Sequence, residues 1–136
     1  MLYKIAHILR DKLPWIWDVI GIINSFFFGL KYDGKMAQVQ NILTHFTKTA
    51  EEDGNALFYK IEVLCKDNLS LLVKMFAEQP ASAFDFFKPH GFDELSLNKL
   101  AKDKSFLAYI VVAEGNAQQK VCVGYFFQRS FFWGKS

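Results

Sequence analysis

A run of 18 residues from Leu13 to Leu30 constrains this fold more than any other feature of the sequence. Only Asp18, Asn24 and Ser25 interrupt its apolar character. As a helix the run would be about 27 Å long, slightly less than the roughly 30 Å hydrocarbon core of a bilayer. No Ala-x-Ala cleavage site follows it, as a secretory signal would require. We therefore expect a buried or interfacial helix rather than a membrane span or a signal peptide.

The surface of this expected helix divides into two kinds of residue. A narrow stripe is small or polar: Asp18, Gly21, Ser25 and Gly29. Such small-xxx-small spacing lets helices approach closely. The remaining surface is large and apolar, with Trp15, Ile16, Trp17, Ile20, Ile22, Ile23, Phe26, Phe27 and Phe28. We expect the helix to pack against the chain or a partner; the alternative is peripheral membrane contact through Trp15, Trp17, Phe26 and Phe27.

The composition excludes several classes of protein. The chain has 136 residues, of which 51% are hydrophobic and 22% charged, so it can form one packed domain rather than a disordered chain. A net charge of +2 gives no clustered basic face, and we expect no nucleic-acid partner. Two cysteines and three scattered histidines offer no metal-ligand spacing, and we expect no metal. No Gly-rich phosphate loop can be written from the glycines.

The first 50 residues are predicted to be helical. A basic helix with Ile5, Ile8 and Leu9 on one face precedes Pro14, which suits the first turn of the apolar helix. A turn at residues 32–34 and a third amphipathic helix over residues 36–46 follow. Residues 47–55 are acidic and almost free of apolar side chains, which indicates a linker. We therefore divide the chain into a helical segment, 1–50, and a mixed region, 51–136.

The mixed region alternates strands and helices. The alternation over residues 57–65 predicts a strand. Two helices follow, one capped by Asp67 or Asn68 and ended at Pro80, the other capped by Asp93. Residues 105–113 and 120–128 predict a hairpin. The expected fold class is α/β (α+β), with a small, three-stranded, mainly antiparallel sheet covered on one face by helices from residues 67–103. The alternative is an all-helical bundle in which residues 57–65 are not a strand.

The hairpin carries a resemblance to a known family. The run Ser-Phe-Leu-Ala-Tyr-Ile-Val-Val-Ala-Glu from Ser105, a short turn, and Val-Cys-Val-Gly-Tyr-Phe-Phe-Gln-Arg from Val121 resemble the middle of GNAT-type acyl-CoA N-acyltransferases. In that family a strand ending in an acidic residue turns into a V-V-G-Y strand, after a strand–helix–helix order that this chain shares. The resemblance covers residues 57 to about 133. Residues 1–50 look like the lead-in of bacterial proteins of this kind from surface-polysaccharide loci.

The resemblance implies an acetyl-CoA-dependent N-acetyltransferase, with the loop over residues 79–93 on the acceptor side. We accordingly take Glu78, Gln79 and His90 as acceptor-side candidates. His90 lies between turn-forming residues, where a base could act; its alternative is a surface residue without a task. The family continues into an Arg/Gln-x-x-Gly-x-Gly/Ala loop that holds the pyrophosphate at a helix N-terminus. That loop is not found before Ser136, so no cofactor-binding residue is carried over, and we expect acetyl-CoA not to bind this chain tightly.

The first functional hypothesis is therefore the front part of an N-acetyltransferase, inactive as this fragment. The alternative is a non-catalytic interaction or membrane-peripheral module that uses the aromatic helix over residues 14–30. We expect a cytoplasmic protein. We also expect a homo-oligomer, because the aromatic helix and the outer edge of the strand over residues 120–128 would both leave apolar surface exposed.

Overall fold

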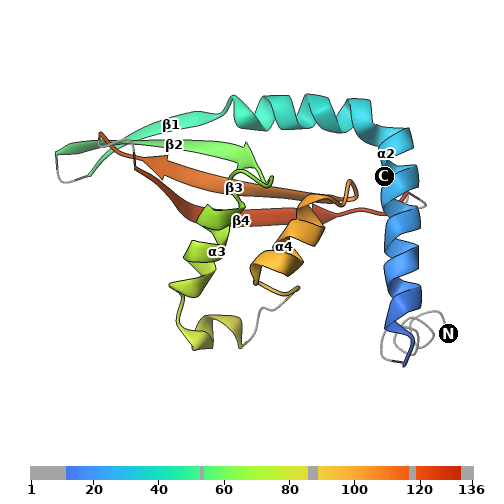
Figure 1. The fold of residues 1–136 in the computed structure, drawn as a ribbon. Coiled ribbons are helices and arrows are strands. Elements are labelled where there is room, and N and C mark those ends of the chain that lie inside the picture. Colours follow the sequence, from blue (N-terminus) through green and yellow to red (C-terminus); the bar gives the residue numbers. More distant parts are fainter. Residues whose placement is uncertain (1–11, 53, 86–88, 117–118, 133–136) are drawn as a thin grey trace.

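A meander of four antiparallel strands organises the chain, and one long helix crosses its end (Figure 1). The computed structural model describes residues 12–52, 54–85, 89–116 and 119–132. The elements are, in chain order, α2 (Pro14–Thr44), β1 (Thr47–Glu52), β2 (Asn55–Val63), α3 (Leu69–Ala77), the 3-10 helix η1 (Ala81–Phe84), α4 (Glu94–Ala101), β3 (Phe106–Glu114) and β4 (Lys120–Arg129). The expected α+β class is confirmed.

The strand order in the sheet is β1-β2-β3-β4, with every neighbouring pair antiparallel. The predicted strand over residues 57–65 and the predicted hairpin are confirmed as β2, β3 and β4. The register pairs Tyr59 with Ala113 and Tyr109 with Phe126, and a bulge interrupts β3 and β4 between Val111 and Val112. The all-helical alternative is therefore excluded.

The predicted linker over residues 47–55 is wrong, because it contains the fourth strand. Thr47–Glu52 forms β1 and pairs along its length with β2. Gly54 makes the turn between them with a φ of 77°, a left-handed backbone that glycine adopts without strain. β1 is an outer strand that is held by backbone hydrogen bonds, so it needs no alternating apolar side chains. Because β1 crosses residue 50, the residues on both sides of the expected domain boundary share one sheet.

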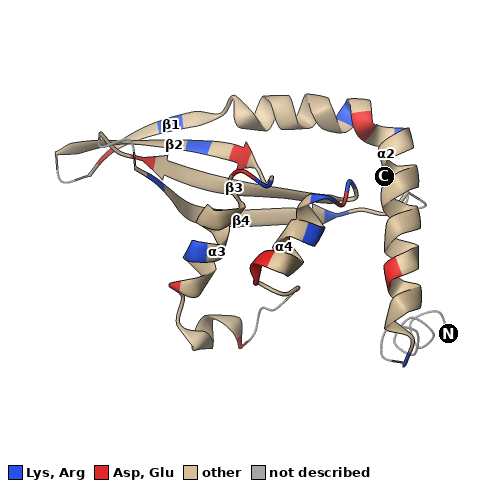
Figure 2. Ribbon diagram, in the orientation of Figure 1, with Lys and Arg blue, Asp and Glu red and all other residues tan. Residues whose placement is uncertain are grey.

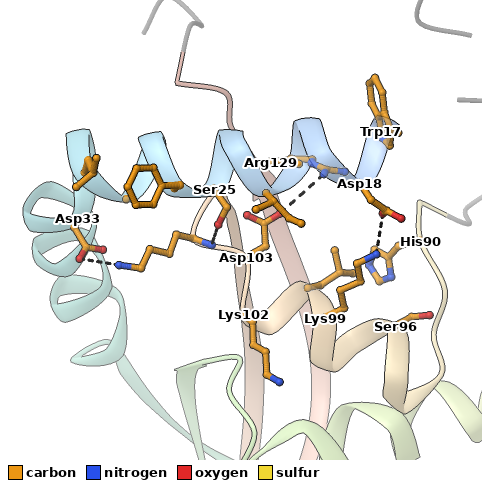
Figure 3. A pocket seen from close by; sticks show the side chains of 17 residues that line it. Trp17, Asp18, Ser25, Asp33, His90, Ser96, Lys99, Lys102, Asp103 and Arg129 are labelled. Carbon is orange, nitrogen blue, oxygen red and sulfur yellow. Dashed lines mark hydrogen bonds and ion pairs between the residues drawn. The ribbon is translucent and has the colours of Figure 1, made fainter. Parts of the chain in front are cut away.

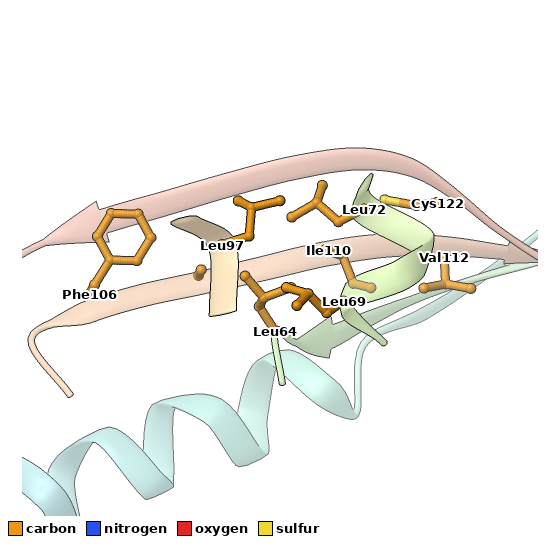
Figure 4. Close-up of a cluster of buried hydrophobic side chains, with 9 residues drawn as sticks. Leu64, Leu69, Leu72, Leu97, Phe106, Ile110, Val112 and Cys122 are labelled. Atoms are coloured by element: carbon orange, nitrogen blue, oxygen red, sulfur yellow. The ribbon is translucent and has the colours of Figure 1, made fainter. Parts of the chain in front are cut away.

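The core lies between the sheet and the two short helices. Figure 4 shows side chains of α3 and α4 meeting one face of β3 and β4. Asp93 caps α4 as predicted, since its carboxylate accepts a hydrogen bond from the Ser96 amide. The buried cluster consists of Leu64, Leu69, Leu72, Leu97, Phe106, Ala108, Ile110, Val112 and Cys122.

A single helix, α2, occupies the residues where two helices and a turn were predicted. Tyr32, Asp33 and Gly34 are helical, although α2 changes direction part-way along its length (Figure 1). An isolated glycine costs a helix only about 1 kcal/mol, and the Tyr32 ring packs at 4.9 Å from that of Phe28, one turn earlier. The predicted helix that carries Ile5 lies outside the described residues. No described helix is both long enough and apolar enough to cross a membrane.

One buried side chain fastens α2 to the end of the sheet. Asn24 is only 1% exposed. Its amide nitrogen donates to the Ser130 carbonyl at 3.0 Å, and its amide oxygen accepts from the Phe132 backbone N–H at 2.9 Å. The Asn24 amide therefore both donates to and accepts from the backbone of the segment that follows β4. This contact orients α2 across the end of the sheet.

Candidate functional site

A cleft of about 700 Å³ lies between α2 and α4. Figure 3 shows α2 along one wall and α4, with the turn that follows it, along the other. His90 and the end of β4 complete the lining. The volume is in the range of clefts that bind small molecules, which makes this cleft the candidate site.

The small and polar stripe of α2 forms one wall of the cleft. Asp18, Gly21, Ser25 and Gly29 all line it. Ser25 Oγ accepts a hydrogen bond from the Lys104 backbone N–H at 2.9 Å. A Cβ added to Gly29 would lie 2.6 Å from Lys104 Cδ, so the absence of a side chain makes room for the lysine stem. The stripe thus serves close approach, as its spacing predicted, but to a turn and a lysine rather than to another helix.

Ion pairs bridge the cleft at its two ends. Lys99 Nζ on α4 lies 2.8 Å from Asp18 Oδ1, and Lys104 Nζ lies 3.2 Å from Asp33 Oδ2 (Figure 3). All four side chains are more than half exposed, so solvent screens both pairs and water or a ligand can displace them.

A third pair lies between these two. Arg129 Nη2 on β4 lies 3.9 Å from Asp103 Oδ2. The other oxygen of Asp103 accepts from both the amide and the hydroxyl of buried Ser105, at 2.9 and 2.6 Å. Asp103 is therefore fixed by the fold, whereas the two outer pairs can rearrange. The cleft presents carboxylates and cations in alternation, an arrangement suited to a ligand that carries an amine or both charges.

His90 borders the cleft and is fixed at both ring nitrogens. Nδ1 lies 2.8 Å from the Gly91 carbonyl, which can only accept, so Nδ1 carries the proton. Nε2 lies 2.9 Å from the Tyr125 hydroxyl and accepts from it in the neutral ring. Burial raises the pKa of Tyr125 far above its usual range, so the phenol keeps this proton. The ring sits edge-on to Phe92, Phe106, Tyr125 and Phe127.

The structure separates the three predicted acceptor-side residues. His90 lines the cleft, but Glu78 and Gln79 do not. Glu78 is exposed at the C-terminal end of α3 and lies 3.9 Å from Lys74. The side-chain amide of Gln79 donates to the Met75 carbonyl. Both residues therefore interact with their own helix.

Several cleft residues were missed in the sequence. Lys99, Lys104 and Arg129 reach the cleft from α4, the following turn and β4. A single carboxylate in a long apolar run, Asp18, was the available signal that a cation would lie nearby. The sequence could not show which cation, because Lys99 is 81 positions away.

The cysteines and other titratable groups suggest no second chemistry. Cys65 is exposed just beyond β2, whereas Cys122 is buried in β4, and burial raises the pKa of its thiol. In the part of the chain that the structure describes, no three His, Cys, Asp or Glu side chains are grouped to hold a metal ion. Comparisons with models of protein families, with characterised proteins and with solved structures give no match, so the site must be interpreted from its own chemistry.

Proposed function

We propose that this chain provides the acceptor side of an acyl-CoA-dependent N-acetyltransferase of the GNAT type, and that the cleft between α2 and α4 receives the acceptor amine. The observation that carries the proposal is the cleft itself, with three carboxylates and a histidine beside the β2–α3–α4–β3–β4 unit. That unit has the strand–helix–helix–strand–strand order of the resemblance, and its strands are antiparallel.

The charges of the cleft suit an amine. A primary amine is protonated near neutral pH and needs carboxylate partners when it binds. Asp18 and Asp33 can supply these carboxylates. Each is paired with an exposed lysine, and that lysine can turn into solvent when a ligand binds. In this arrangement a bound ammonium group takes the place of Lys99 or Lys104.

His90 is the group that can take the proton from the amine. An amine must lose its proton before it acts as a nucleophile, and Nε2 of His90 is unprotonated in the tautomer that the Gly91 carbonyl fixes. The amine would have to replace the Tyr125 hydroxyl at this nitrogen. Tyr125 then serves as the alternative partner that holds the ring in orientation when no acceptor is bound.

The described part of the chain contains no Gly-rich loop of the kind that holds the acyl-CoA pyrophosphate. A helix N-terminus would have to offer free backbone N–H groups to it. At α4 the Asp93 carboxylate already occupies that position. At α3 no side chain caps the helix, but no Gly-rich loop precedes it either. We therefore assign only the acceptor side to these residues.

Binding of an amino sugar, compared with the same sugar without the amine, tests the proposal. Glucosamine and glucose differ by one amino group, and titration of each into the ¹⁵N-labelled chain reports where it binds. We expect glucosamine alone to shift the amides of residues around Asp18 and Lys99. Asp18→Asn should weaken its binding about two- to fivefold, as expected for one exposed charge contact. Asp67→Asn, an exposed carboxylate before α3, is the matched control. Equal shifts from both sugars, or shifts on another surface, would contradict the amine site.

A second measurement tests the division between acceptor and cofactor. Calorimetry of the chain with acetyl-CoA should give no tight binding, because no Gly-rich loop for the pyrophosphate precedes a described helix. Micromolar or tighter binding would show that the cofactor site is present after all.

A non-catalytic interaction module is the second candidate, and one observation favours it. The large apolar side chains of α2 remain exposed, including Trp15, Phe26 and Phe27 from the expected membrane contact. Trp17, the fourth residue of that contact, lines the cleft, and so does Phe26.

A further inference from the structure

A second, smaller cavity lies between the later part of α2 and the sheet, where β2 ends and β3 begins. Its volume is about 280 Å³, and we call it the smaller cavity. Met36, Ala37 and Gln40 line it from α2, and the turn between α4 and β3 lines it from the other side. Its volume equals that of roughly nine molecules of liquid water. The smaller cavity can therefore hold an organic molecule of about that many non-hydrogen atoms.

The smaller cavity is separate from the cleft between α2 and α4. The cleft extends along α2 as far as Asp33, whereas the smaller cavity begins at Asp33 and extends to Gln40. Between the two spaces the Lys104 stem lies against Gly29, and its Nζ pairs with Asp33 Oδ2 at 3.2 Å. The turn over residues 102–104 therefore separates the cleft from the smaller cavity and lines both.

The charges that line the smaller cavity do not cancel. Asp33 is paired with Lys104, and Asp103 lies 3.9 Å from Arg129. Lys102 also lines the cavity, and within the part of the chain that the structure describes it has no ion-pair partner. Figure 3 shows the Lys102 side chain pointing away from the first half of α2, where the ion pairs of the cleft lie. Lys102 is thus an uncompensated positive charge, and charges of the molecule as a whole are sparse in this region (Figure 2).

The uncharged part of the lining suits the rest of an organic acid. Gln40 is half-buried, and among the described residues its side-chain amide has no hydrogen-bond partner, so it can donate to a carboxylate. Met36, Val63 and Leu107 line the same cavity and are partly buried. Sites for small molecules usually combine an apolar wall with a few polar groups of this kind.

We propose that the smaller cavity binds a short-chain carboxylate, with its charged end at Lys102 and Gln40 and its hydrocarbon chain against Met36 and Leu107. A carboxylate only accepts hydrogen bonds, which suits an ammonium group and an amide N–H. An acid of about six carbons, such as hexanoate, is close to the size that the volume allows. The proposal is independent of the amine site in the cleft, because Lys102 is not among the groups assigned to the amine.

Binding of hexanoate, compared with binding of hexanamide, tests the charge of the ligand. The two molecules have the same size, but hexanamide is neutral. Titrated into the ¹⁵N-labelled chain, hexanoate should shift the amide signals of Met36, Gln40 and Leu107 with a dissociation constant of about 1 mM. Hexanamide should bind about fivefold more weakly. Equal binding of the two molecules, or no saturable shift with hexanoate, would overturn the proposal.

Removal of one charge tests the role of Lys102. Lys102→Met keeps most of the side-chain stem and should weaken hexanoate binding about two- to fivefold. Lys66→Met, at an exposed lysine after β2 that does not line the cavity, is the matched control and should bind hexanoate like the parent. An equal loss in both variants would mean that hexanoate responds only to net charge, and the assignment of Lys102 would be wrong.

A larger side chain in the cavity tests the location. Ala37 is exposed on α2, so Ala37→Leu should leave the fold intact, which circular dichroism checks. The added side chain narrows the cavity and should weaken hexanoate binding at least about fivefold. Gln38→Leu, one position along the helix and outside the lining, is the control. Unchanged hexanoate binding by a folded Ala37→Leu variant would overturn the proposed location.

Other ligands and surfaces give distinct results. If inorganic phosphate shifts the amides of Met36 and Gln40 and hexanoate does not, the cavity takes a phosphate group and the assignment of a carboxylate is wrong. If hexanoate instead shifts the amides of Trp15 and Ile22, it binds the exposed apolar side chains of α2, and the proposal is also wrong.

Discussion

The helices α3 and α2 are both amphipathic, yet they place their apolar sides in opposite directions. α3 buries Leu69 and Leu72 against the sheet and exposes Lys74 and Glu78 to solvent. α2 buries Phe28 but exposes Trp15, Phe26 and Phe27, and it is fastened to the sheet by Asn24. The first helix is held by apolar burial and the second by hydrogen bonds and close approach.

The difference shows what a hydrophobic stripe does and does not specify. Apolar periodicity identifies a face that avoids water, but it does not say whether that face meets the same chain or another one. The polar side of α2 has directional partners on the sheet and the α4–β3 turn, which fix its orientation without a large apolar contact. Apolar side chains such as Trp15 and Ile22 are thereby left exposed.

Truncation of a core residue on α3 should lower the stability of the fold more than any other change. If it did not, α3 would not be held by apolar burial. Leu72 is completely buried between α3 and the sheet, so Leu72→Ala leaves a cavity and should lower the free energy of unfolding by about 2–5 kcal/mol. Phe26→Ala removes a larger side chain from α2. Measured by urea unfolding at concentrations where the chain is monomeric, it should change the free energy by less than about 0.5 kcal/mol. A comparable loss in both variants would mean that Phe26 is packed within the chain.

Removal of the amide that fastens α2 should give the next largest effect. Asn24→Ala leaves the Ser130 carbonyl and the Phe132 N–H without their bonds to α2 and should cost about 1–3 kcal/mol in urea unfolding. Asn41→Ala, at an exposed position of the same helix, is the control and should be nearly neutral. An equal, small effect of both would show that α2 is attached by other contacts.

The sequence predicted the elements with strong apolar patterns and missed those held by the backbone. Ile61, Ile110 and Val123 lie in long apolar alternations, and their strands were predicted to within two residues. β1 was missed because an outer strand of threonine, lysine and glutamate reads as a loop. The turn expected at Gly34 does not exist, since one glycine does not end a helix whose neighbours pack.

The candidate site could be predicted only in part. His90 was recognised from its local setting in a Pro-His-Gly loop, and it does line the cleft. Its partner Tyr125 is 35 positions away, and Lys99 is 81 positions from Asp18. Pairings at such separations follow from the order of strands and from the angle at which α2 crosses the sheet. The spacing of residues along the sequence indicates neither the strand order nor this angle.

Acidification should weaken a charged contact on the sheet. Burial alone would raise the pKa of Glu62, but hydrogen bonds from Asn68 and Lys60 and the charges of Lys120 and Lys60 outweigh it and lower this pKa below 4.5. A lowered pKa in the folded state means that ionised Glu62 stabilises the fold above about pH 4.5, and that this stability is lost as the pH falls through the folded value.

Replacement by glutamine measures this contribution. At pH 7 the free energy of unfolding measured in urea should be larger for the parent than for Glu62→Gln by on the order of 1 kcal/mol. This difference should shrink toward pH 3. Glu51→Gln, on exposed β1, is the control and should show no such trend. A difference that grows on acidification would reverse the assigned sign.

The smallest effect is expected where α2 meets α4 across the cleft. Asp18 and Lys99 are 2.8 Å apart but mostly exposed, so Asp18→Asn should change the free energy of unfolding by less than about 1 kcal/mol. The same variant should weaken glucosamine binding, because the carboxylate is free to exchange its lysine for a ligand. Lys99→Met removes the competing cation while retaining an apolar stem, and should strengthen glucosamine binding where Asp18→Asn weakens it. Opposite effects on binding with little change in stability would separate the cleft from the contacts that hold α2. A large stability loss in either variant would instead make the ion pair part of that attachment, and Asp18 would not be free to bind the amine.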